Sequence, residues 1–136
     1  MAAANQPMCR VRDRLAGQQI LVTGSTGFLA KVFVEKLLRS VDTLGGIHLL
    51  VRPRADGTSA RQRVTQDVLR SSVFDRLRAS LGERFTRLCD EKIHVIGGDL
   101  TKERMGIDVA AYHELTRRIT LVVNSAATVT FDERLD

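Results

Sequence analysis

A strand that turns into a helix through a loop of small residues dictates most of what this 136-residue chain can fold into. The stretch LVTGSTGFLAKV starts at residue 21, and after its apolar run Gly24, Gly27 and Ala30 follow at three-residue intervals. A turn beneath a pyrophosphate needs backbone without side chains, and the N–H groups and positive dipole end of the following helix then face the phosphates. We expect Gly24 to make the turn, Gly27 to admit the phosphate, and Ala30 to bring the helix close to the strand. The same spacing also suits a flexible strand-to-helix turn that binds nothing.

Four short apolar segments have the character of strands that are buried on both faces, as in a parallel sheet. They occupy residues 18–24, 46–52, 92–98 and 119–125. Helical patterns fill the gaps: one after the glycine loop, one from Ser59, where a capping box with Gln62 is predicted, and one after Asp108. The apolar stripes of these three helical regions are Ala30, Val34, Leu37, Leu38 and Val41, then Val64, Val68 and Leu77, then Tyr112, Leu115 and Ile119. This order predicts an α/β protein with the N-terminal half of a Rossmann-type doubly wound parallel sheet, strand order 3-2-1-4.

Charge and cysteine content exclude several classes of protein. The net charge of +5 lies wholly within residues 52–87, where nine arginines stand against four acids. That segment faces an anion or forms a solvated helix face, whereas nucleic acid is disfavoured because aromatics are few and no recognition motif occurs. Only Cys9 and Cys89 are present, in no metal-type spacing, so neither a disulfide framework nor a zinc site is predicted.

The lengths of the apolar runs and the composition of the N-terminus indicate where the protein is located. The longest are far short of the roughly 20 residues that span a bilayer, and the N-terminus lacks the apolar region of a secretory signal. We expect a polar tail over residues 1–14, a fold that begins at residue 15, and a cytoplasmic protein, with peripheral membrane association left open.

The end of the second strand indicates which cofactor is bound. About 20 residues past the glycines, an acid would accept a hydrogen bond from the ribose of NAD, and an arginine would accommodate the 2′-phosphate of NADP. Arg52 stands at this position, Arg54 follows, and no acid occurs until Asp56. The sequence therefore favours NADPH, although an ordinary surface arginine can also end a strand. After the third strand, Asp99 either accepts a hydrogen bond from the adenine amino group or caps the turn that follows.

With these residues in place, VTGSTGFL at 22–29 resembles the fingerprint of the extended short-chain dehydrogenase/reductases, which fold as Rossmann domains. Narrower matches resemble the N-terminal part of fatty acyl-CoA reductase. They are FVEKLLRS at 33–40, HLLVRPR at 48–54, SSVFDRLR at 71–78, GGDLT at 97–101 and NSAATVTFDERL at 124–135. The resemblance implies NADPH-dependent reduction of a long-chain acyl-CoA thioester to a fatty aldehyde or alcohol, by hydride transfer to the carbonyl carbon.

The resemblance also implies a role for individual residues. These are Thr23, Gly24, Thr26, Gly27 and Phe28 for the pyrophosphate, Arg52 for the 2′-phosphate, Asp99 and Leu100 for adenine, and Ala126 and Ala127 for the nicotinamide-side pocket. Ala30 stands where the family usually has glycine, a change that the loop tolerates because only a small residue is needed there. Residues 124–127 equally suit a strand end packed on the first helix.

Reductases of this kind use a Tyr-x-x-x-Lys pair that the sequence lacks. The only tyrosine, Tyr112, lies on a predicted sheet-packing stripe with Thr116 four residues on, so we expect it in the core. Residues 15–136 are thus interpreted as a partial NADPH-binding domain that ends before the catalytic pair and the acyl-binding region. Two alternatives stay open: a module that reduces carrier-protein thioesters, against which SSVFDRLR argues, and a catalytically silent protein that senses NADPH or serves in interactions.

Overall fold

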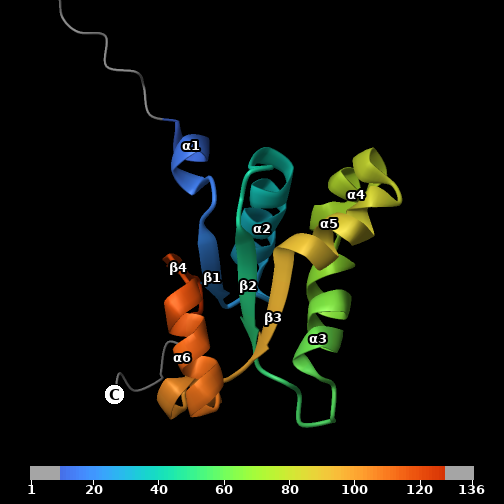
Figure 1. Ribbon diagram of the computed structural model, residues 1–136. Helices are drawn as coiled ribbons and strands as arrows, with labels where there is room; N and C mark the ends of the chain where they lie inside the picture. The colour runs from blue at the N-terminus through green and yellow to red at the C-terminus, as the bar shows by residue number, and fades with distance from the viewer. Residues whose placement is uncertain (1–9, 128–136) are drawn as a thin grey trace, which may run out of the picture.

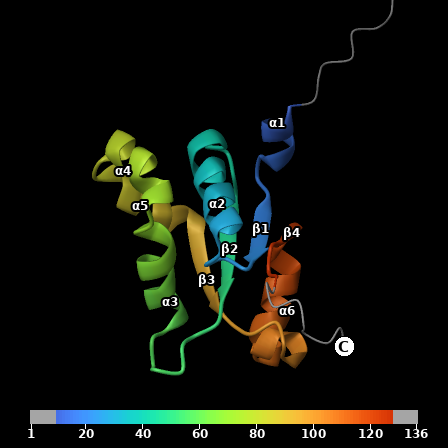
Figure 2. The same cartoon turned by 180° about the vertical axis from the view of Figure 1, so that it is seen from behind.

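A computed structural model describes residues 10–127 as a four-stranded parallel sheet with helices on both faces (Figures 1 and 2). The strand order β3-β2-β1-β4 confirms the predicted half of a doubly wound sheet. In chain order, the elements are α1 (Val11–Leu15), β1 (Gln19–Thr23), α2 (Phe28–Ser40), β2 (Gly46–Val51), α3 (Ala60–Arg63), the π-helical turn η1 (Val64–Leu69), the 3₁₀ turn η2 (Ser72–Phe74), α4 (Asp75–Leu81), α5 (Arg84–Lys92), β3 (Ile93–Gly97), the 3₁₀ turn η3 (Glu103–Gly106), α6 (Val109–Arg118) and β4 (Leu121–Asn124).

The four strands stand in register across the sheet. Ile20 of β1 pairs with Ile47 of β2 and with Leu121 of β4, and Ile47 pairs with Ile93 of β3. Because every pairing is parallel, the carboxyl ends of the strands meet along one edge of the sheet, the lower edge in Figure 1. Each strand lies within two residues of its predicted range.

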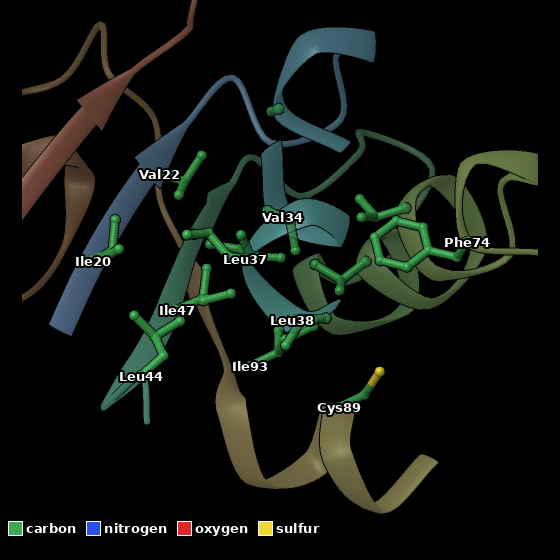
Figure 3. Close-up of a cluster of buried hydrophobic side chains, with 14 of the residues drawn as sticks. Ile20, Val22, Val34, Leu37, Leu38, Leu44, Ile47, Phe74, Cys89 and Ile93 are labelled. Carbon is green, nitrogen blue, oxygen red and sulfur yellow. The ribbon is translucent and has the colours of Figure 1, made fainter. Parts of the chain in front are cut away.

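The core lies between α2 to α5 and one face of the sheet (Figure 3). The predicted stripe of α2 is buried along its whole length, and Val34 and Leu37 lie near Val22 and Ile47 of the strands. The predicted capping box is present as well: the side chain of Ser59 accepts from the backbone of Gln62, and the side chain of Gln62 accepts from the backbone of Ser59. The inward residues of the next helical region are also buried; these are Val64, Val68 and Leu77.

The region after Ser59 is more broken than its periodicity indicates. It consists of short helical pieces, because Ser71 caps the turn at Val73 and Gly82 ends α4 with a φ of 55°. α1 is a second departure: it places a helical turn inside the predicted polar tail. Its five mostly exposed residues carry no apolar periodicity, so their sequence does not predict a helix.

The predicted position of Tyr112 in the core is wrong. It was expected in the core, but α6 contains no buried residue, and Tyr112, Leu115 and Ile119 are only half-buried. The predicted stripe does mark the less exposed side of this helix. α6 lies on the face of the sheet opposite to α2 (Figures 1 and 2), and the periodicity of a helix shows which side turns inward, not how completely that side is covered.

Candidate functional site

A cleft with two chambers runs along the carboxyl edge of the sheet. The chambers have volumes of about 310 and 790 Å³ and share Arg52, Arg63, Gly98 and Asp99. The smaller one is also lined by Gly24, Ser25, Thr26, Leu50, Val51, Leu100 and Ala126. This edge lies where the strand order reverses around β1, which is where open α/β sheets bind their ligands.

Gly24 is required by the close approach of two chain segments as well as by the turn. Its φ is 65°, and a Cβ atom there would lie 2.6 Å from backbone atoms of Ser125 and Ala126. Two further contacts hold these segments together: the Thr23 hydroxyl donates to Asn124 Oδ1, and the Ser125 hydroxyl donates to the Thr23 carbonyl at 2.7 Å. The glycine loop is thereby fixed against the end of β4.

Gly27 is the N-cap residue of α2, and it brings no side chain to the first turn of that helix. Its φ of −73° is accessible to any residue, and its N–H donates to the Gly24 carbonyl at 2.9 Å. Whereas Ser59 caps α3 and Asp108 caps α6 with side-chain oxygens, no side-chain hydrogen bond caps α2 within the described residues. The backbone donors of this turn, together with the helix dipole, are suited to hold a phosphate.

Four cationic side chains line the larger chamber, those of Arg52, Arg54, Arg63 and Lys102. Arg52 lies just past β2, its side chain is 69% exposed, and its guanidinium is 3.7 Å from the Asp99 carboxylate. Arg63 is mostly buried and donates through Nη1 to the carbonyl of Arg52 at 2.7 Å. This side of the cleft is therefore suited to an anion.

Neither Arg63 nor Lys102 was predicted from the sequence. A signal for Arg63 was available, since it lies in the arginine-rich segment one helical turn after the predicted cap at Ser59. Lys102 lies in the turn after β3, two residues past the predicted Leu100, but no motif or spacing in the sequence singled out Lys102 itself.

Asp99 caps a turn and lines both chambers. Its Oδ1 accepts from the backbone N–H of Thr101 at 3.0 Å and from the Thr101 hydroxyl at 2.8 Å. These hydrogen bonds lower the pKa of Asp99, with smaller contributions from Arg52 and Lys102. The capping role that the sequence left open is thus present, and the carboxylate is ionised at neutral pH.

Not every predicted residue reaches the cleft. Thr26, Leu100 and Ala126 line the smaller chamber, and Arg54 lines the larger one while paired with Asp67. Phe28 is 75% exposed and Ala127 is exposed. Neither of these two lines a chamber, nor do Thr23 and Gly27.

Two further features are absent from residues 10–127. No helix there combines the length and apolar character of a membrane span, and no group of three or more His, Cys, Asp or Glu side chains is placed to hold a metal ion.

Comparison with known proteins agrees with this geometry. The profile of an NAD-binding family described as male sterility protein matches residues 22–136. An alcohol-forming fatty acyl-CoA reductase of Simmondsia chinensis is 41% identical over 132 residues, 96% of this chain and 27% of the relative. The probable fatty acyl-CoA reductase 5 of Arabidopsis thaliana is 43% identical over 124 residues, 90% of this chain and 25% of the relative.

A solved structure has a similar fold. The reductase domain of a non-ribosomal peptide synthetase from Mycobacterium tuberculosis superposes with a TM-score of 0.61 and 33% identity, over 82% of this chain and 24% of that one. The chain spans about a quarter of the length of these relatives. Family and fold together indicate a nicotinamide cofactor, and the chain belongs to the NAD-binding family described as male sterility protein.

Proposed function

We propose that this chain is the NADPH-binding part of a fatty acyl-CoA reductase, which reduces long-chain acyl-CoA thioesters to fatty aldehyde or alcohol. The observation that carries the proposal is the convergence of the glycine loop, Arg52 and Arg63 on one cleft at the carboxyl edge of the sheet. The similarity to fatty acyl-CoA reductases supplies the substrate class. Residues 15–136 form the proposed cofactor-binding part.

The residues present fit a dinucleotide. A Cβ atom at Gly27 would lie 3.1 Å from the Gly24 carbonyl, so the loop is already tight without any side chain. The first turn of α2 is proposed to hold the pyrophosphate, with Thr23, Gly24, Thr26 and Phe28 forming the loop around it. Asp99 and Leu100 are proposed to border the adenine, and Ala126 and Ala127 the nicotinamide side.

A cationic chamber beside the ribose position supports NADPH over NADH. Arg52, Arg54, Arg63 and Lys102 line this chamber, and among residues 10–127 Asp99 is the one acid that lines it. A 2′-phosphate there gains charge-assisted hydrogen bonds, which are stronger than neutral ones. When bound, the nicotinamide cofactor supplies the hydride that reduces the carbonyl carbon.

A carrier-protein thioester is the second candidate substrate, because the reductase domain from the Mycobacterium tuberculosis peptide synthetase shares 33% identity and the fold. The experiment that separates the candidates measures NADPH oxidation by the full-length enzyme with palmitoyl-CoA and with the same acyl group on a carrier protein. Faster turnover of the CoA thioester supports the proposal, and turnover of the carrier-bound thioester alone would contradict it. A Gly27→Val variant should abolish oxidation in either case.

A further inference from the structure

One carboxylate joins the loop after β2 to the helix that follows it. Asp67, on η1, has a side chain that is 21% exposed, and it accepts from Arg54 Nη2 at 3.1 Å through Oδ1 and at 2.9 Å through Oδ2. Oδ2 also accepts from Nε of Arg63 at 3.1 Å. Asp67 lines neither chamber of the cleft, whereas both arginines line the larger one.

These contacts determine how the two guanidinium groups are held. Arg63 uses Nε for Asp67 and Nη1 for the carbonyl of Arg52, while Arg54 uses only Nη2. The other guanidinium nitrogens of Arg54 and Arg63 make no hydrogen bond within residues 10–127. A guanidinium has five N–H donors in a fixed plane, so a carboxylate bound at one side leaves donors for a second anion.

The local backbone contributes to this arrangement. η1 is a π-helical turn that continues directly from α3, and the Arg70 N–H bonds the carbonyl of Thr65, five residues earlier. Single π-helical turns within helices are rare and often occur at functional sites. Here the turn carries the carboxylate that faces Arg54 across the loop.

We propose that Asp67 is a positioning residue for the 2′-phosphate of NADP and acts through Arg54 and Arg63; this inference rests on the cofactor proposed above. Long side chains lose rotamer freedom when they bind an anion, and a carboxylate that already holds them removes part of that cost before the ligand arrives. The same carboxylate repels a phosphate by its own charge. The first effect strengthens phosphate binding and the second weakens it. Removing the charge of Asp67 therefore shows which effect is larger.

The test compares two ligands that differ only in the 2′-phosphate, adenosine 2′,5′-bisphosphate and 5′-AMP, by isothermal titration calorimetry on the purified protein. Asp67→Asn is expected to lower the affinity for the bisphosphate roughly tenfold, whereas the affinity for 5′-AMP should change by less than about twofold. Asp67→Glu, which keeps the carboxylate, should recover most of the loss. Asp75→Asn is the matched control: it makes the same charge change on α4, where Asp75 pairs with Arg78 at 2.7 Å and lines neither chamber.

Each other result overturns the inference. Tighter or unchanged binding of the bisphosphate by Asp67→Asn would show that the carboxylate acts only through its charge or not at all. If Asp67→Asn lowered the affinity for both ligands equally and also lowered the melting temperature of the protein, the role of Asp67 would be structural alone. If the unmutated protein binds both ligands equally, the proposed NADP preference itself fails, and that result is distinct because it appears before any substitution is made.

Discussion

Replacing Gly24 or Gly27 by alanine separates the two tasks that the glycine loop performs. At Gly24 the φ of 65° costs an alanine roughly 1–2 kcal/mol. Its Cβ would also lie 2.6 Å from backbone atoms of Ser125 and Ala126, where ordinary carbon contacts need about 3.5–4.0 Å. Such overpacking costs about 1–3 kcal/mol, because backbone must move. Gly24→Ala is therefore expected to lower the free energy of unfolding by about 2–5 kcal/mol in total.

Gly27→Ala is the matched comparison. The φ of −73° suits an alanine, and the nearest atom to its Cβ is the Gly24 carbonyl oxygen at 3.1 Å. The free energy of unfolding should change by less than about 1 kcal/mol. The alanine lowers the conformational entropy of the unfolded chain, and this gain offsets the cost of the close contact in the folded state. NADPH binding should nevertheless weaken, because the added methyl group stands where we propose that the pyrophosphate approaches.

The assay is urea unfolding followed by circular dichroism, with both variants and the unmutated protein under one buffer. A Gly24→Ala variant as stable as the unmutated protein, or an equal loss of stability in the two variants, would refute the separation of the two tasks.

Three further predictions concern other residues. Arg52→Ala should lose most of the preference for NADPH over NADH in titration calorimetry; a variant that keeps the full preference would show that another residue reads the phosphate. Burial lowers the pKa of His48 from 6.5 to about 4, helped by the charges of His94 and Arg118, so protonation favours the unfolded chain as pH falls from 6.5 to 4. The free energy of unfolding should drop by about 2 kcal/mol from pH 7 to pH 5, and His48→Gln should reduce this slope, whereas equal slopes would contradict the assignment. Burial also raises the pKa of the Cys89 thiol to about 11, so peptide mapping should find slow alkylation of Cys89 in the native protein and fast alkylation in urea; equal rates would contradict its burial.

Local signals account for what the sequence predicted correctly. Continuous apolar runs marked the four strands, the stripe from Ala30 to Val41 marked the buried side of α2, and Ser59 with Gln62 marked a cap. Each signal lies within a few residues of the structure it predicts, and right-handed crossovers then leave few strand orders.

Features that depend on contacts between distant segments were not predictable in the same way. The pair of Arg63 and Asp67 is four residues apart on a helix and visible in principle, but the bond from Arg54 to Asp67 depends on how the loop folds back on η1. The sequence indicated that Gly24 makes a turn, yet its close approach to Ser125 joins residues about a hundred positions apart. Tyr112 was wrongly predicted to lie in the core, because the periodicity of a helix does not show how completely other residues cover its inward side.

We propose that the cleft binds a dinucleotide and recognises its 2′-phosphate. Titration of the unmutated protein with NADPH and NADH at one ionic strength tests this proposal most directly. Charge-assisted hydrogen bonds to the 2′-phosphate predict that NADPH binds about 10- to 150-fold more tightly. Both cofactors should lose affinity in Gly27→Val. Equal affinity for NADPH and NADH, or NADPH binding that survives Gly27→Val, would contradict the account.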